Sequence, residues 1–210
     1  MHTWKFCPQG LIIGVDEAGV GPLAGPMVAC AVALRNRNPE IFEDLRDSKK
    51  MTPKQRDRAA MVISRNALTW RIRWLDPFEV DRAGSTARIG LMGLAVRDVA
   101  LCLQNLGKRP DLVVVDGDIE ISTVYAQKAL IGGDDACLEV AAASVMAKVL
   151  RDQYMTSLAK TYPGYGWSKN MGYGTPGHIR AIIDHGLTPH HRPGYTRTAL
   201  ETFRAKNADL

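Results

Sequence analysis

Carboxylate side chains follow three apolar segments of this 210-residue chain, and they carry its strongest chemical signal. The pairs are Asp16 and Glu17 after LIIGV, Asp116 and Asp118 in DLVVVDGD, and Asp134 and Asp135 after QKALIGG. Carboxylates that gather at one place repel one another unless a cation compensates their charge. Hard oxygen ligands of this kind suit Mg²⁺ or Mn²⁺, and two such ions can activate a water and stabilise the leaving oxygen in phosphodiester cleavage.

A structural explanation competes with this chemistry. A single Asp after a strand is more often a turn residue or a helix cap than a catalytic group. Three acidic clusters after three apolar segments weaken that explanation. The spacing of the acids alone does not decide between the two.

The elements that would position these acids are predicted from the hydrophobic pattern. Strands are expected at 11–15, 27–34, 68–75, 111–118 and 127–133, and helices at 53–66, 85–106, 137–160 and 176–184. The first two strands resemble a hairpin, and the later ones alternate with helices, which predicts an α/β fold with a mixed sheet. Ligands bind such sheets where the carboxyl ends of the strands meet. The segment 162–178 is expected to lack regular structure, and no element is predicted in the polar segment 196–210.

Composition narrows the class of protein. The chain is 46% apolar and 23% charged, with a net charge of +5, which is typical of a globular protein and permits a polyanionic partner. We expect a single domain over 1–210, with a core at about 11–196 and a polar tail at 197–210. The four cysteines form no metal-binding pattern, and no signal peptide or membrane-length apolar run is present, so we expect a cytoplasmic protein.

Longer motifs resemble one known family, ribonuclease HII (type 2 ribonuclease H). The segments are IIGVDEAGVGPLAGPMVACAV, RDSKKMTP, VVVDGD, GDDACLEVAAASVMAKVLRDQYM, YPGYGWSKNMGYGTPGH and GLTPHHRPGYT. They occur in the family's order and cover about residues 11–196. Only fifteen residues precede Asp16, so we expect a type 2 enzyme rather than a type 3 enzyme with its extra N-terminal domain.

The resemblance implies a fold and an activity. The fold is RNase H-like, with a mixed five-stranded sheet flanked by helices and a small helical C-terminal part. The activity is endonucleolytic cleavage of RNA in RNA–DNA hybrids, and cleavage 5′ of a single ribonucleotide embedded in duplex DNA. The products would carry 3′-hydroxyl and 5′-phosphate ends, the cofactor would be Mg²⁺ or Mn²⁺ with two ions in the catalytic complex, and the protein would be a monomer.

The family's four acids match Asp16, Glu17, Asp116 and Asp134. The last match follows from spacing, because the family's acid stands seven residues before the small-residue element that here spans Ala141 to Ser144. Asp16 would bridge the ions, Glu17 and Asp116 would flank it, and Asp134 would serve the side of the attacking water. Asp118 and Asp135 are then expected to support these ligands or to be structural.

The predicted substrate contacts also follow from the resemblance. The family's G-R-G turn and a tyrosine, which read the 2′-hydroxyl at the RNA-to-DNA junction, match Gly19, Val20, Gly21 and Tyr173. Val20 stands where the family usually has Arg, and Met171 stands where Lys is common. We therefore expect weaker substrate binding more than lost discrimination.

Several basic and polar residues are predicted to contact phosphate groups. Lys49 and Lys50 precede a helix that Thr52-Pro53 is expected to begin, and Ser48 is expected to cap or orient their loop. Ser144, Lys148 and Arg151 share one helix face, and Ser144 and Lys148 are predicted phosphate contacts. The alternative for both groups is an ordinary solvated surface.

Aromatic and histidine residues gather near the C-terminus. Tyr162 and Trp167 are predicted to pack, and Tyr173 to contact the substrate sugar. The nearby group His185, His190 and His191 favours surface or DNA-phosphate contacts over a zinc site, which would need about four good ligands.

Two rival functions remain at this stage. One is a catalytically weak homologue that binds hybrid duplexes, suggested by Val20 and Met171. The other is a different nuclease or a phosphatase with an acid-lined site. The C-terminal segment TALETFRAKNADL lacks the Gln-led pattern of sliding-clamp ligands.

Overall fold

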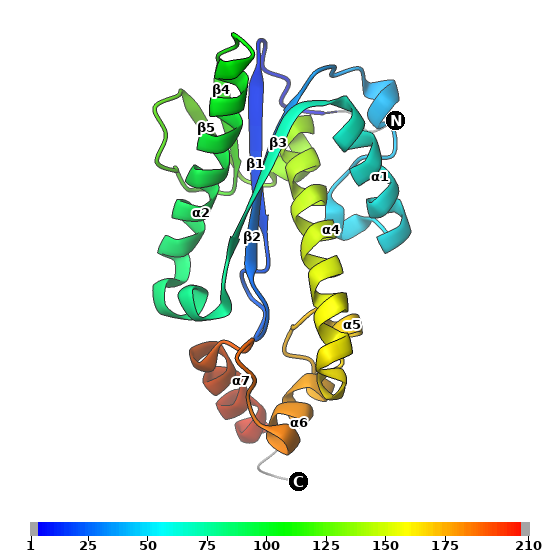
Figure 1. The fold of residues 1–210 in the computed structure, drawn as a ribbon, viewed down its shortest axis with the longest axis vertical. Coiled ribbons are helices and arrows are strands. Elements are labelled where there is room, and N and C mark those ends of the chain that lie inside the picture. The colour runs from blue at the N-terminus through cyan, green and yellow to red at the C-terminus, as the bar shows by residue number, and fades with distance from the viewer. Residues whose placement is uncertain (1–3, 207–210) are drawn as a thin grey trace. The chain divides into compact units, whose positions relative to one another are not determined.

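The computed structural model describes residues 4–206, except for the side chains of Pro39 and Ser85. The chain forms two compact units (Figure 1). The first contains the chain up to Ala18 together with Val28–Trp74 and Arg88–Val149, and the second contains Gly19–Met27, Leu75–Ala87 and the chain from Leu150 onward.

A mixed five-stranded sheet forms the centre of the first unit, as predicted. Strand β1 (Ile12–Ala18) pairs antiparallel with β2 (Met27–Leu34) and parallel with β4 (Leu112–Asp116), and β4 pairs parallel with β5 (Gln127–Leu130). With β3 (Ala67–Leu75) at the other edge, the order is β3-β2-β1-β4-β5. Every residue of β2 is buried, as its uninterrupted apolar sequence requires.

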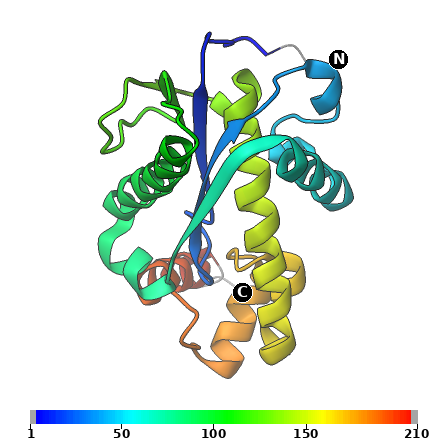
Figure 2. The ribbon, with the colours of Figure 1, turned by 45° about the horizontal axis from the view of Figure 1, so that its top comes forward.

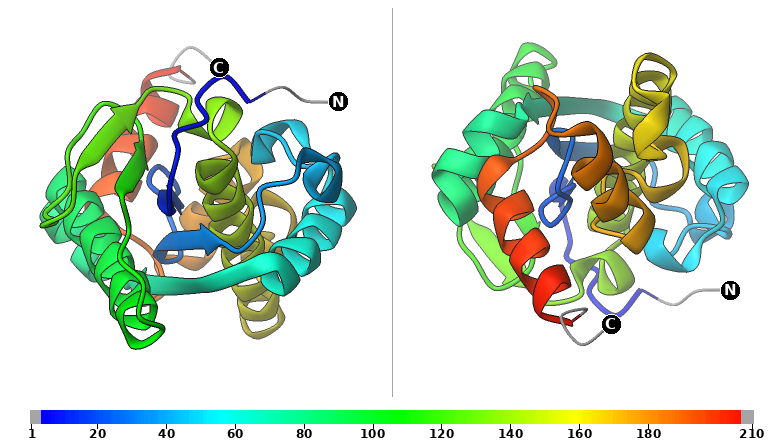
Figure 3. Two further views of the ribbon diagram at one scale, coloured as in Figure 1. Left: turned by 90° about the horizontal axis from the view of Figure 1, so that it is seen from above. Right: turned by 90° about the horizontal axis from the view of Figure 1, so that it is seen from below.

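Helices cover both faces of this sheet. Helix α1 (Pro53–Asn66) and the first turns of α4 (Leu138–Thr161) lie on one face, and the part of α2 (Pro77–Asn105) from Arg88 onward lies on the other (Figures 2 and 3). Thr52 and Gln55 form a capping box at the start of α1, which confirms its predicted beginning. Short helices η1 (Pro39–Phe42), η2 (Ser48–Lys50) and α3 (Gly133–Ala136) connect the larger elements.

The second unit contains the glycine-rich turn at 19–27 and the C-terminal helices. These are η3 (Pro163–Tyr165), α5 (Trp167–Asn170), α6 (Pro176–His185) and α7 (Pro193–Lys206), and α6 and α7 are in contact (Figure 3). Trp167, Tyr165 and Met155 are buried in the unit's apolar cluster, against which Tyr162 also packs. The packing predicted for Tyr162 and Trp167 is therefore confirmed.

The structure corrects several predicted boundaries. Strand β1 continues to Ala18, so Asp16 and Glu17 lie within the strand rather than after it. Segment 162–178 is expected to lack regular structure before the helix at 176–184, but it contains η3 and α5. Helix α6 begins at Pro176, as predicted. The predicted helix 85–106 begins earlier, at Pro77, with a non-helical Gly84 inside it. Most of the polar segment 196–206 is helical in α7, and residues 207–210 lie outside the described residues. No helix within residues 4–206 combines the length and the apolar character that a membrane crossing needs.

Candidate active site

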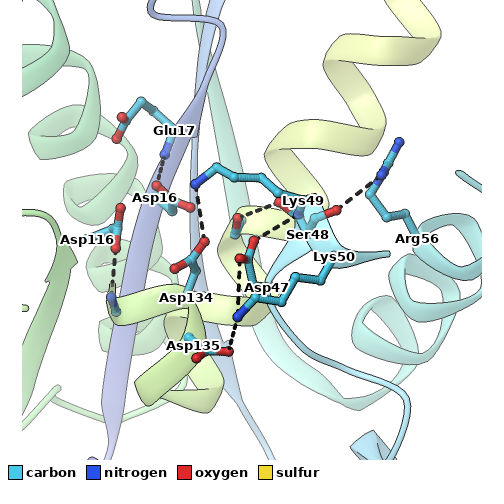
Figure 4. Close-up of polar contacts among 12 residues, drawn as sticks. Asp16, Glu17, Asp47, Ser48, Lys49, Lys50, Arg56, Asp116, Asp134 and Asp135 are labelled. Atoms are coloured by element: carbon cyan, nitrogen blue, oxygen red, sulfur yellow. Dashed lines mark hydrogen bonds and ion pairs between the residues drawn. The ribbon is translucent and has the colours of Figure 1, made fainter. Parts of the chain in front are cut away.

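Four carboxylates meet at one edge of the sheet in the first unit (Figure 4). Because β1, β4 and β5 run parallel, their carboxyl ends share this edge. Asp16 and Glu17 lie near the end of β1, Asp116 is the last residue of β4, and Asp134 lies in the first turn of α3, just after β5. The structure thus brings together the four acids that the sequence singled out.

Asp16 and Glu17 are neighbours that project to opposite sides of β1, as successive strand residues do. The Glu17 N–H donates to Asp16 Oδ1 at 2.7 Å. Glu17 Oε1 forms an ion pair with Arg88 Nε of α2 at 2.8 Å, and Glu17 Oε2 is buried without a hydrogen-bond partner. Arg88 therefore holds Glu17 by one oxygen and leaves the other available.

The end of β4 is joined to the start of α3 by one hydrogen bond. The Gly133 N–H donates to Asp116 Oδ1 at 2.8 Å. The next residue, Asp134, is 5% exposed, and its Oδ2 lies 3.5 Å from Lys49 Nζ. Asp135 forms an ion pair with Lys50 at 3.1 Å, and Asp118 is exposed.

The lysine loop, residues 47–50, carries two cations beside these acids. Asp47, not Ser48, caps η2: its Oδ1 accepts from the Lys49 N–H at 2.8 Å, so the capping expected of Ser48 is wrong. Arg56 Nη1 of α1 donates to the Ser48 carbonyl at 3.1 Å. The side chains of Lys49 and Lys50 are 79% and 58% exposed, so the loop backbone is anchored while both ammonium groups stay accessible.

Hydroxyl groups connect this loop to Asp16. Ser48 Oγ lies 3.0 Å from Ser144 Oγ of α4, and both side chains are buried. Ser144 also makes a hydrogen bond to the Asp16 carboxylate. Since a carboxylate only accepts, Ser144 donates to Asp16 and Ser48 donates to Ser144. Ser48 thus orients the site through Ser144. Lys148, one turn further along α4, is half-buried.

The backbones of β1 and α4 touch beside this network. A Cβ atom at Gly14 would lie 2.2 Å from the carbonyl carbon of Glu139. Real Cβ atoms do not approach another atom so closely, so only glycine fits between this strand and this helix. Glu139 itself is buried and forms an ion pair with Arg37 at 2.6 Å.

Burial and mutual repulsion shift the titration of the acids in one direction. Burial raises the pKa of Asp16 well above its usual value, and the charges of Glu17 and Asp116 raise it further. Burial also raises the pKa of Glu17 against the opposing effect of Arg88, and that of Asp134 against the opposing effect of Lys49. The site therefore holds more negative charge than its own cations compensate.

The acids fit a hard divalent cation by donor type and charge. Glu17 Oε2 is buried and lacks a hydrogen-bond partner, and Asp134 Oδ2 is buried with the Lys49 ammonium 3.5 Å away. Carboxylate oxygens are preferred ligands of Mg²⁺ and Mn²⁺. Within residues 4–206, however, no three candidate ligand side chains are already arranged closely enough to hold an ion. These residues would hold such a cation only if the carboxylates lay closer together and the Lys49 ammonium left Asp134.

The second unit brings together the predicted contacts of the glycine-rich turn. Arg192 is fully buried, and its guanidinium donates to the carbonyls of Gly19 at 2.6 Å, Val20 at 2.7 Å and Gly25 at 2.8 Å. Val20 and Gly21 are exposed. With its carbonyls bound on the buried side, the turn is fixed from within and is open to a ligand at Val20 and Gly21.

A second buried arginine joins this turn to the segment that carries Tyr173. Arg151 donates to the carbonyls of Pro26 at 2.9 Å, Ala24 at 3.1 Å and Met171 at 3.0 Å. Gly19 has φ +90, and a Cβ atom there would lie 2.1 Å from Arg151 Nε, so glycine is required. The Tyr173 side chain is 46% exposed.

Sequence reasoning missed several of these functional neighbours. Arg88, Gly133 and Arg192 were not singled out, and Arg151 was placed on a polar helix face although it is 1% exposed. Arg192 lies 173 positions from Gly19, and no local pattern predicts such a contact. His191 was expected near the surface or DNA but is buried beside His178 and Trp167.

Comparisons with known proteins agree with this arrangement. The family model described as Ribonuclease HII matches residues 13–202. Ribonuclease HII of Anaplasma phagocytophilum (strain HZ) is 38% identical over 202 residues, which cover 96% of this chain and 93% of the relative. Ribonuclease HII of Paracoccus denitrificans (strain Pd 1222) is 42% identical over 187 residues, which cover 88% and 84%. The solved structure of ribonuclease H2 from Pyrococcus horikoshii OT3 matches with a TM-score of 0.69 at 26% identity, over 93% of this chain and 99% of that one. Since the matched residues include both the acidic edge and the C-terminal segments, this chain belongs to the ribonuclease HII family.

Proposed function

We propose that this endoribonuclease, besides cleaving RNA in RNA–DNA hybrids, cuts duplex DNA on the 5′ side of a single embedded ribonucleotide. The products would carry 3′-hydroxyl and 5′-phosphate ends. The observation that carries the proposal is the edge of the sheet where four acids converge and where the buried Glu17 Oε2 lacks a hydrogen-bond partner.

Enzymes of this family are metal-dependent, and we propose Mg²⁺ or Mn²⁺, in two sites, as the cofactor here. Asp16, between Glu17 and Asp116, would be shared by both ions, and Asp134 would hold the ion on the side of the attacking water. Bound there, the cations would supply the positive charge that favours deprotonation of that water and stabilises the leaving 3′ oxygen.

The chain's own residues prepare this site. Arg88 fixes Glu17, and Ser48 and Ser144 fix the Asp16 carboxylate by successive hydrogen bonds. Lys49 and Lys50 carry exposed ammonium groups beside the acids, so they can meet the scissile strand's phosphates. We propose that Lys148 takes part in the same contact. The phosphate contact predicted for Ser144 is not part of this proposal, because this side chain is buried and its hydroxyl proton is donated to Asp16.

Selection of the ribonucleotide is assigned to the second unit. We propose that backbone groups of Gly19, Val20 and Gly21 read the 2′-hydroxyl and that the Tyr173 ring contacts the sugar. The exposure of Val20, Gly21 and Tyr173 supports this assignment, as do the buried arginines that fix the backbone beneath them. Because Val20 cannot bind phosphate as an arginine would, we expect affinity to be reduced more than discrimination.

One cleavage assay tests the whole proposal. A labelled DNA duplex with one ribonucleotide is incubated with Mg²⁺, Mn²⁺ or EDTA, beside an all-DNA duplex and a long RNA–DNA hybrid. We expect a nick immediately 5′ of the ribonucleotide that EDTA removes and that the all-DNA duplex lacks. Asp16→Asn protein serves as the matched control and should not cut.

The other outcomes separate the rival functions. Cutting of the long hybrid alone would show that the junction is not read and would contradict the assignment of Gly19, Val20, Gly21 and Tyr173. Binding without cutting would favour the catalytically weak homologue. Cutting of all-DNA duplex would point to a different nuclease.

A further inference from the structure

Two histidines and a tryptophan form a buried hydrogen-bond network in the second unit. His178 of α6 is fully buried, and its Nε2 lies 3.0 Å from Trp167 Nε1 and 3.2 Å from His191 Nε2. On its other side, His178 Nδ1 lies 2.9 Å from the carbonyl oxygen of Tyr173. Polar groups in an apolar cluster are costly unless every one is satisfied. The hydrogen bonds of this network can therefore all form only if each histidine carries its proton on one particular ring nitrogen.

The backbone partner of His191 determines that arrangement. The Thr188 N–H donates to His191 Nδ1 at 2.9 Å, so a neutral His191 carries its proton on Nε2. That proton is donated to His178 Nε2, which also accepts from the Trp167 indole. His178 must then carry its own proton on Nδ1 and donate it to Tyr173. Burial lowers the pKa of both histidines, which favours these neutral forms.

The segment that receives this bond is held at three consecutive carbonyl groups. The donors are Arg151 Nη1 for Met171, the Leu23 and Ala24 N–H groups for Gly172, and His178 Nδ1 for Tyr173. The Thr175 N–H also donates to the Tyr173 carbonyl, at 2.8 Å. The backbone of Tyr173 is thus fixed from the buried side while its ring stays exposed.

We propose that His178 is a positioning residue for the substrate: through its Nδ1–H bond to the Tyr173 carbonyl, it sets the direction in which the Tyr173 ring meets the sugar. The inference rests on the proposed contact between Tyr173 and substrate. His178 does not touch the substrate. By holding the Tyr173 ring in one direction before the substrate binds, His178 reduces the conformational entropy that the ring loses on binding.

Two substitutions divide the functions of the His178 ring. In His178→Asn, the side-chain amide reaches the place of Nδ1 and can donate to Tyr173, but the acceptor for Trp167 and His191 is lost. In His178→Gln, the amide reaches the place of Nε2 and can accept from the network, but the donor to Tyr173 is lost. Each variant therefore serves as the control for the other.

We expect both variants to be less heat-stable than the wild type but to differ in kinetics. On the single-ribonucleotide duplex, His178→Gln should raise KM about tenfold with kcat little changed. This is the pattern expected when the loss of one ordering hydrogen bond weakens substrate binding alone. His178→Asn should stay within about twofold of the wild-type KM. If KM rises in both variants in proportion to their loss of heat stability, the role of His178 is purely structural and the inference is overturned.

A double-mutant cycle with Tyr173→Ala separates this inference from the proposed function. If His178 acts through Tyr173, His178→Gln adds no further increase in KM once the ring is absent. If Tyr173→Ala alone leaves KM unchanged, the proposed substrate contact is wrong. If Tyr173→Ala raises KM and His178→Gln does not, the contact stands and the positioning role fails.

The proton arrangement can be measured in the wild type, without any variant. Nitrogen-15 NMR of histidine-labelled protein should show His178 protonated on Nδ1 and His191 protonated on Nε2 at neutral pH. The opposite tautomer at His178 would leave no donor for Tyr173 and would overturn the inference even if both variants failed to fold.

Discussion

Acidification should destabilise the second unit through His191. Burial, together with the nearby His178, lowers the pKa of His191 from its ordinary value of 6.5 to about 4. Protonation would place a second proton at Nδ1, where the Thr188 N–H already points, 2.9 Å away. The folded state can accept this proton only by losing the bond from the Thr188 N–H, although the Thr188 hydroxyl oxygen, 3.0 Å from the same Nδ1, can then accept it.

The direction and size of the effect follow from proton linkage. Between pH 6.5 and 4, the unfolded chain binds a proton at His191 that the folded chain does not bind, so stability falls as the pH falls. The full difference, from 6.5 to about 4, is worth about 3 kcal/mol. Between pH 7 and 4.5 we expect a loss of about 2 kcal/mol, which lowers Tm by roughly 4–8 °C for a chain of this length.

The assay compares the wild type with His191→Asn in urea unfolding at pH 7, 6, 5 and 4.5. Asn can still accept a hydrogen bond from the Thr188 N–H at the place of Nδ1, but it does not titrate. The variant should therefore be less stable at pH 7, and its free energy of unfolding should fall less steeply as the pH is lowered. The raised pKa values of Asp16, Glu17 and Asp134 act in the opposite direction, because their protonation on acidification favours the folded state. These acids are common to both proteins and cancel in the comparison. Equal losses of stability in the two proteins would refute the argument that His191 is held neutral by burial.

Further predictions concern the acids, the glycine-rich turn and the sheet. Asp16→Asn should abolish cleavage yet raise the metal-free Tm, by about 2–4 °C for each kcal/mol of relieved charge burial; a variant that loses both activity and heat stability would contradict the electrostatic account. Val20→Arg should lower KM on the single-ribonucleotide duplex several-fold and steepen its salt dependence by about one ion; an unchanged KM would refute a missing phosphate contact. Gly14→Ala should cost about 3 kcal/mol or more in unfolding free energy, whereas Gly90→Ala, where nothing lies within 4 Å of the added Cβ, should be neutral or stabilising; similar effects of the two would mean that β1 and α4 do not touch.

The acidic edge of the sheet was predictable because its signals are local. An apolar run followed by an acid gives both the strand and the carboxylate, and Asp16, Asp116 and Asp134 lie at the shared edge for that reason. The parallel pairing of β1, β4 and β5, expected from the predicted α/β fold with a mixed sheet, then brings them together. The single-domain organisation, the monomeric state, the cytoplasmic location and the individual residue roles stay predictions.

What supports the site was less predictable because its contacts join distant parts of the chain. Arg88, Arg151 and Arg192 are ordinary charged residues in the sequence, and only the fold shows their carboxylate or carbonyl partners. Helix α7 did carry a usable signal: Tyr195, Ala199 and Phe203 recur every four residues and pack against the apolar cluster of the second unit. Its many polar residues obscured that pattern.

The contact of β1 with α4 at Gly14 restricts how the site can respond to a change of ligand. Where two backbones already touch, the strand and the helix cannot move closer together, so Asp16 and Ser144 keep a fixed separation. Adjustment to ions of different radius would then involve the exposed side chains of Lys49 and Lys50, since the backbone that carries them is anchored. A tolerance for both Mg²⁺ and Mn²⁺ would thus depend on how freely the Lys49 side chain can leave Asp134, and a less mobile side chain there should narrow the choice of metal without moving Asp16 or Ser144.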